Sequence, residues 1–149
     1  MESTRLERLR AAAEAFRRAL LAVPGLDLPV TLRTFPVGAC GDTCLLLGAY
    51  LHDLGLGPFA YVNGSRPVER APGLLQSHAW LASTDGTVID ITAHQFSEFP
   101  EPVYVGAATA WHGTFDSAQQ GTADFRNYDP RTVEALGRVY AAIRSRVGV

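Results

Sequence analysis

The chain has 149 residues, which is enough for one folded domain spanning residues 1–149 and too few for a second. Hydrophobic residues make up 47% of it and charged residues 19%, a composition typical of globular proteins that excludes a disordered chain. With a formal net charge of −2, no overall field attracts nucleic acid. All 13 basic residues are arginines, which excludes chemistry based on a lysine Schiff base or a phosphate-loop lysine.

No membrane partner and no secretory signal are expected. The longest apolar runs, such as residues 19–23, are far shorter than the roughly 20 residues that a membrane span requires. The first residues lead into a charged, amphipathic segment with no apolar core typical of a signal peptide. Cys40 and Cys44 are the two cysteines, and a reduced state is the simplest interpretation of their four-residue spacing. We therefore expect a cytoplasmic protein, and the sequence gives no indication of its oligomeric state.

Both ends of the chain are predicted to be helical. Thr4 and Glu7 form a capping-box pattern, and apolar residues then recur at steps of three and four until Pro24-Gly25 ends the helix. Near the C-terminus, Asp129 is suited to cap a helix with Pro130 in its first turn. An apolar stripe over residues 133–147 then faces the core.

The first half of the central region is predicted to contain a strand and a helix. Residues 29–35 alternate between apolar and polar side chains, which indicates a short strand. From about Asp42 to Leu54 the apolar residues recur at helical steps, and glycines follow. We expect Asp42 to cap this helix.

The second half is predicted to be built from hairpins. Residues 59–62 favour a strand that ends at Asn63-Gly64. Two further strands, 75–83 and 87–92, flank Asp85-Gly86, a dipeptide typical of tight turns. Residues 102–106 suggest one more strand, and 107–128 receive no assignment. The fold class is therefore α+β with a small antiparallel sheet.

Cys40 is the candidate nucleophile because of its place before the central helix. A helix N-terminus stabilises a thiolate and offers free backbone N–H groups. The N–H of Cys40 could also bind a developing oxyanion. Cys44 lies on the apolar stripe of the same helix, so we interpret it as a core residue. Taken alone, Cys40 would also fit as a small buried residue.

His78 and Asp90 are the candidate partners of Cys40. They lie on the two strands of the predicted hairpin, at offsets that make them diagonal neighbours on one face rather than directly opposite. Asp90 interrupts the apolar run from Val88 to Ile91, where an ionised carboxylate needs a partner. His78 can supply one.

These residues carry a resemblance to a known family. A cysteine at a helix start, then His-Ala-Trp-Leu at residues 78–81, an Asp-Gly turn and Ile-Asp-Ile-Thr at residues 89–92 resemble the core of the transglutaminase-like superfamily, within the papain-like thiol fold. The resemblance covers residues 35–96. It implies a nucleophile helix packed on a small antiparallel sheet, with Cys40 as nucleophile, His78 as general base and acid, and Asp90 as the orienting residue. No glutamine precedes Cys40, so the second oxyanion donor is unidentified.

Weaker candidates surround this trio. Trp80 shares the strand face of His78, and Gln95 follows the Asp90 strand, so both are expected as substrate-binding or shielding residues. His94 and His112 receive no assigned role. The spacing of cysteines and histidines does not match a compact metal site, so neither a metal nor another cofactor is expected.

The function predicted from these features is thiol-dependent acyl transfer on an amide of a peptide or protein. Hydrolysis, by a peptidase or deamidase, is favoured over cross-linking because water is always present and no amine site is recognisable. A non-catalytic binding or scaffold domain on the same fold is the alternative. A redox-sensing thiol is a third hypothesis, but Cys44 is poorly placed as a resolving cysteine.

Overall fold

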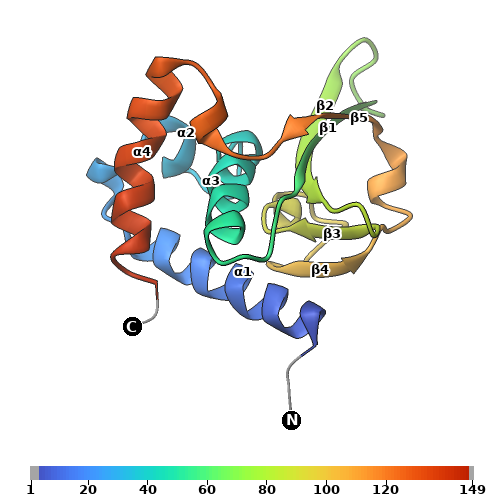
Figure 1. The fold of residues 1–149 in the computed structure, drawn as a ribbon. Helices are drawn as coiled ribbons and strands as arrows, with labels where there is room; N and C mark the ends of the chain where they lie inside the picture. The colour runs from blue at the N-terminus through green and yellow to red at the C-terminus, as the bar shows by residue number, and fades with distance from the viewer. Residues whose placement is uncertain (1–3, 148–149) are drawn as a thin grey trace.

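The computed structural model describes residues 4–147, which form an α+β fold with four α-helices and a five-stranded antiparallel sheet, the class expected from the sequence. Helix α3 lies between α4 and the sheet, and α1 runs along the base of both (Figure 1). No helix in this part of the chain is long and apolar enough to cross a membrane. The helices are α1 (Arg5–Ala22), α2 (Val30–Arg33), α3 (Cys40–Asp53) and α4 (Pro130–Arg144), and the strands are β1 (Ala60–Pro67), β2 (Leu75–Ala82), β3 (Thr87–Asp90), β4 (Tyr104–Ala107) and β5 (Asp116–Thr122).

The two terminal helices begin as predicted. Both hydrogen bonds of the capping box between Thr4 and Glu7 are present at the start of α1. Asp129 accepts a hydrogen bond from the N–H of Thr132, with Pro130 as the first residue of α4. Both helices pack against α3 and against each other, and α1 also contacts β4. The most enclosed residues of their apolar stripes are Leu9, Ala13, Phe16, Leu20, Val139 and Ile143.

The central helix begins earlier than predicted. Helix α3 starts at Cys40, with Ala39 as its N-cap, so the expectation that Asp42 caps it is wrong. The Asp42 carboxylate instead accepts a hydrogen bond from the hydroxyl of Thr31. Every residue from Thr43 to Leu51 is buried, because α1, α4 and the sheet cover this helix from different sides.

The predicted strand at residues 29–35 is also wrong. Val30–Arg33 forms the single-turn helix α2, which packs against α3 and buries only Leu32. A strand needs a neighbour that pairs with its backbone, and this segment lies on the helical side of the molecule. An alternation over so few residues does not distinguish a strand from one helical turn.

The sheet has the strand order β4-β3-β2-β1-β5. The hairpin around Asp85-Gly86 is confirmed, and Gly86 has the positive φ of 88° that this turn needs. Strand β1, however, does not end at Asn63-Gly64 but continues to Pro67, so that prediction is wrong. Gly64 serves close strand packing instead, because a Cβ there would lie 2.8 Å from the Cβ of Ser117.

The C-terminal part of the sheet comes mostly from the segment that the sequence left unassigned. The strand expected at residues 102–106 is present as β4, which begins two residues later and ends one residue later. Residues 107–128 contain the short 3-10 helix His112–Thr114, strand β5 and a second 3-10 turn, Phe125–Asn127. All seven residues of β5 are exposed, which explains the lack of an apolar pattern there.

The two faces of the sheet bury different clusters. Ala79, Leu81 and Ile89 pack on the helical side, in the main core. Val62, Trp80 and Val88 face the other way and pack with Phe115 in a second, mostly aromatic cluster. By the alternation of side chains along a strand, His78 and Asp90 belong to this second face.

The contact between α3 and the segment after β5 gives a test of the fold. A Cβ on Gly48 would lie 1.9 Å from the carbonyl oxygen of Ala123, a backbone atom that cannot move aside alone. We expect Gly48→Ala to lower the free energy of unfolding in urea by roughly 1–3 kcal/mol, the usual cost of overpacking, or more.

Gly137→Ala is the matched control for this prediction. Gly137 lies in α4, and its added Cβ would meet nothing closer than a Phe125 ring atom at 3.9 Å. Replacing a helical glycine by alanine should stabilise the protein by about 0.5–1 kcal/mol. Equal stabilities of the two variants would contradict the close crossing of the chain over Gly48.

Candidate functional site

Strands β2 and β3 pair only briefly, and the candidate site lies where they separate. In the described residues, the register between them covers Leu81↔Ile89 and Ala82↔Val88. Continued by one residue, this register sets Asp90 opposite Trp80 and diagonal to His78, as the sequence predicted. Beyond that point the strands diverge, and the 3-10 helix Ala93–Gln95 follows β3.

Cys40 is the first residue of α3 and is partly exposed. The first N–H groups of a helix have no acceptor within the helix and carry its positive dipole end. Cys44, one turn further, is buried as expected, and burial raises the pKa of its thiol well above the ordinary value. The two cysteines of the chain therefore have opposite environments.

His78, on β2, is fully buried and hydrogen-bonded to Asp90. The distance from His78 Nε2 to Asp90 Oδ2 is 2.7 Å. Burial lowers the pKa of His78, but hydrogen bonds with Asp90 and Cys40 outweigh burial and raise this pKa to about 9. Since Nε2 is engaged with Asp90, Nδ1 is the nitrogen that remains for Cys40. The structure thus joins His78 to Asp90 by a hydrogen bond and places Cys40 near the same imidazole.

Asp90, at the end of β3, is an ionised group inside the protein. Its Oδ1 accepts the backbone N–H of Thr92 at 3.0 Å, and its Oδ2 accepts from two imidazoles, those of His78 and His112. Burial raises the pKa of Asp90, but the hydrogen bonds from His112 and His78 outweigh it and bring this pKa down to about 2. The carboxylate therefore stays charged at neutral pH.

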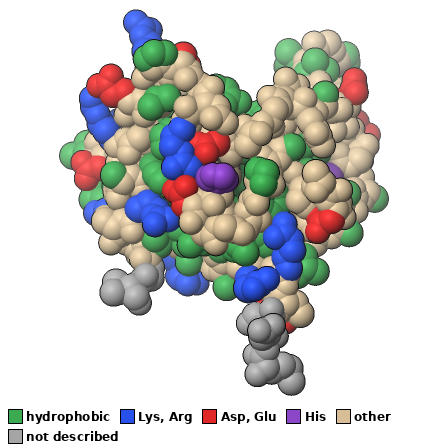
Figure 2. All heavy atoms as spheres, in the orientation of Figure 1, with side chains coloured by type: hydrophobic (Ala, Val, Ile, Leu, Met, Phe, Trp, Pro, Cys, Tyr) green, Lys and Arg blue, Asp and Glu red, His purple; other side chains and the backbone are tan. Residues whose placement is uncertain are grey.

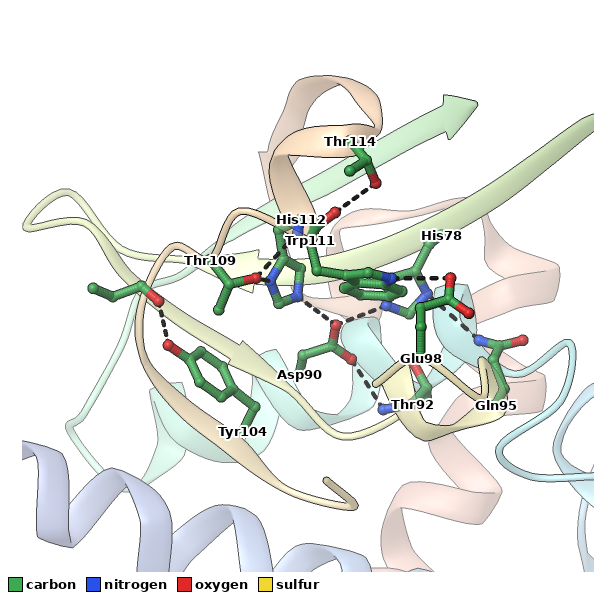
Figure 3. A network of polar contacts seen from close by, with 11 residues as sticks. His78, Asp90, Thr92, Gln95, Glu98, Tyr104, Thr109, Trp111, His112 and Thr114 are labelled. Carbon is green, nitrogen blue, oxygen red and sulfur yellow. Dashed lines mark hydrogen bonds and ion pairs between the residues drawn. The ribbon is translucent and has the colours of Figure 1, made fainter. Parts of the chain in front are cut away.

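His112 is the residue at this site for which the sequence predicts no role. It lies in the 3-10 helix before β5, and its Nε2 is 2.8 Å from Asp90 Oδ2 (Figure 3). Its other nitrogen, Nδ1, is 2.7 Å from the hydroxyl oxygen of Thr109. Because the surrounding segment has no strand or helix periodicity, no pattern in the sequence pointed to this histidine.

Gln95 links the turn before Cys40 to His78. Its Oε1 accepts the backbone N–H of Gly38 at 3.4 Å, and its Nε2 is 3.4 Å from His78 Nδ1. Because the N–H of Gly38 can only donate, the amide oxygen must face it, and the amide NH₂ then faces the imidazole. The structure brings Gln95 to the same edge of His78 that meets Cys40.

Trp80 shields the histidines from water. Its side chain is buried, with its ring centroid 5.7 Å from that of His78 and 4.8 Å from that of His112. Trp80 forms part of an aromatic wall and also lines a surface pocket with His112, so its expected substrate-binding role stays a prediction. Other rings of the wall, all within 6.0 Å of the His78 ring, are Phe96, Trp111 and Phe115.

Arg66 covers the outer side of this wall. Its guanidinium carbon lies 4.3 Å from the centre of the Phe115 ring, and the group pairs with Glu98. Glu98 also accepts a hydrogen bond from the indole N–H of Trp111 at 3.1 Å. Elsewhere, acidic and basic side chains are interspersed over the face seen in Figure 2.

His78, Asp90 and His112 are also the kind of residues that bind metal ions, and their ligand atoms lie within 4.8 Å of one another. The two Nε2···Oδ2 distances, 2.7 and 2.8 Å, are hydrogen-bond distances. Ligand atoms around a tetrahedral zinc ion are about 3.3 Å apart, given bonds of about 2.0 Å. The arrangement therefore fits imidazole N–H groups donating to a carboxylate.

No protein-family model, curated protein or solved structure matches this chain, so the case for its function rests on the geometry of these residues.

Proposed function

We propose that the protein carries out thiol-dependent acyl transfer on an amide, with Cys40 as nucleophile, His78 as general base and acid, and Asp90 as the orienting residue. The observation that carries this proposal is the buried hydrogen bond between His78 and Asp90, with Cys40 close enough to the same imidazole to help raise its pKa. The arrangement agrees with the papain-like, transglutaminase-like core that the sequence resembles. The substrate class is a peptide or protein amide.

The reaction follows from the two faces of the imidazole. With its pKa raised to about 9, His78 holds on Nδ1 the proton that the thiol gives up, and the Cys40 thiolate attacks the amide carbonyl carbon. As the C–N bond breaks, the same proton passes to the leaving amine, and an acyl thioester remains on Cys40. A water molecule, deprotonated by His78, then attacks the thioester and releases a carboxylic acid and the free thiol. Hydrolysis is proposed over cross-linking because it needs no second binding site for an amine.

Two groups are available to stabilise the oxyanion of this reaction. The backbone N–H of Cys40 lies at the N-terminus of α3, where the helix leaves it without an internal acceptor. The amide NH₂ of Gln95 points to the edge of His78 that meets Cys40. Gln95 thus fills the role for which the sequence, lacking a glutamine before Cys40, offered no candidate.

The reactivity of Cys40 tests the proposal directly. At pH 6.5, well below the roughly 8.5 at which a free thiol titrates, Cys40 should react with iodoacetamide while Cys44 does not. His78→Gln, which keeps an N–H donor for Asp90 but removes the base, should slow alkylation of Cys40 by roughly tenfold or more. Mass spectrometry of the labelled peptides gives both rates, and Asp90→Asn should act in the same direction.

Cys44 is the internal control in this experiment, because both residues are labelled in one sample. If Cys40 and Cys44 react alike, or if His78→Gln leaves the Cys40 rate unchanged, the nucleophile assignment is wrong. The protein would then be a binding or scaffold domain in which the His–Asp contacts serve only to stabilise the fold.

The role of Gln95 can be separated from that of the nucleophile. Acylation of Cys40 by p-nitrophenyl acetate develops an oxyanion, whereas alkylation by iodoacetamide does not. Gln95→Met keeps the side-chain length but removes the donor, and should slow acylation roughly tenfold to a hundredfold. The alkylation rate, measured where the thiolate is fully formed, should stay within about twofold of the wild type. A parallel loss of both rates would contradict an oxyanion role.

A further inference from the structure

One oxygen of Asp90 serves two imidazoles, and the proposed reaction uses only one of them. Asp90 Oδ2 is 2.7 Å from His78 Nε2 and 2.8 Å from His112 Nε2, and all three side chains are buried (Figure 3). Among the described residues, the side-chain hydrogen bonds of His112 go to Asp90 and Thr109 and not to Cys40. Its contact with the orienting carboxylate is therefore unexplained by the triad alone.

The contacts of His112 fix where its proton lies. The hydroxyl oxygen of Thr109 accepts the backbone N–H of His112 at 3.1 Å, which leaves the hydroxyl hydrogen free to donate. The ionised Asp90 Oδ2 can only accept, so His112 Nε2 carries the proton of that contact; in the neutral ring the Thr109 hydroxyl, 2.7 Å away, then donates to Nδ1. In this tautomer the ring proton is on Nε2 and is donated to Asp90.

Building on the proposed function, we infer that His112 is a positioning residue that divides the Asp90 carboxylate between two imidazoles and thereby limits the proton affinity of His78. Each hydrogen bond that a carboxylate accepts draws negative charge away from its other partners. With His112 in place, Asp90 orients His78 but holds its imidazolium less strongly than an unshared carboxylate would. The base of the triad is thus kept able to release its proton to a leaving amine.

The other ionisable groups around the carboxylate do not replace this contact. Cys44 on α3 and His94 in the 3-10 helix after β3 both lie within range of its charge, and Cys40 lies near His78. Tyr104 on β4 pairs with Asp90 through the backbone, and its hydroxyl donates to the carbonyl of Ala107. The ion pair of Arg66 with Glu98 lies beyond the aromatic wall. Of these groups, only His112 joins His78 in donating a side-chain hydrogen bond to Asp90.

Two substitutions of His112 form a matched pair. His112→Phe keeps a ring among its aromatic neighbours, Trp80, Phe99 and Trp111, but removes the donor. His112→Gln brings an amide N–H to about the position of Nε2. Histidine side-chain NMR then follows the titration of His78, whose pKa is raised to about 9 in the native protein by Asp90 and Cys40 against the effect of burial.

The His78 titration should move upward by roughly 0.5–1 pH unit in His112→Phe, because Asp90 is then shared with fewer donors. In His112→Gln it should return to within a few tenths of a unit of the native value. A titration unchanged or lowered in His112→Phe, or a Gln variant that behaves like the Phe variant, would overturn the inference.

A measurement on the native protein tests the role of His112 even if a variant fails to fold. The ¹⁵N shifts of the His112 ring should report the tautomer with its proton on Nε2, and a proton on Nδ1 would overturn the inference. Because these readouts follow histidines and compare proteins that all carry Cys40, they do not depend on whether Cys40 reacts. An unreactive Cys40 would refute the proposed function, whereas an unshifted His78 would refute the role of His112.

Discussion

The buried charge of Asp90 is the constraint on which the site depends. An ionised carboxylate inside a protein is costly unless hydrogen bonds replace its hydration. Three donors meet it, from three parts of the chain: His78 on β2, the N–H of Thr92 just after β3, and His112 before β5. Removing any of these donors would leave the charge less well compensated. Asp90 therefore connects the β2–β3 hairpin to the segment that follows β4.

The aromatic side chains around Asp90 and its two histidines exclude water from the buried charge. Trp80, two residues from His78, must lie on the same side of the sheet, and it packs with Phe115 over the imidazoles. Arg66 then covers Phe115 with a guanidinium that is itself paired with Glu98. An aromatic wall lowers the local dielectric and strengthens each hydrogen bond to the carboxylate. The charge, the wall and the covering ion pair therefore support one another.

The sequence predicted the parts of this arrangement that have a local pattern. Asp90 within an apolar run and His78 on the facing strand were identified because alternation and a tight turn determine the register of a hairpin. The sequence does not predict a role for His112, because its segment is held in place by the Asp90 carboxylate and not by a periodic pattern of buried residues. The prediction that a strand ends at Gly64 is wrong for a related reason. Gly64 allows the close approach of β5, and the exposed residues of β5 carry no apolar pattern that would predict this strand. The roles of His112 and Gly64 depend on contacts between segments that are far apart in the sequence, which no local pattern predicts.

The contacts of Asp90 and the thiol of Cys40 differ in what they indicate about function. The His78–Asp90–His112 contacts would be needed in any protein that buries this carboxylate, whether or not it is an enzyme. Cys40 differs, because its side chain packs against the core only in part and leaves a partly exposed thiol at the start of α3, near the imidazole of His78. Cys44 fills the packing role of a cysteine one turn further along the same helix. Stability of the fold therefore does not explain why a partly exposed thiol stands at the start of α3, whereas acyl transfer requires one.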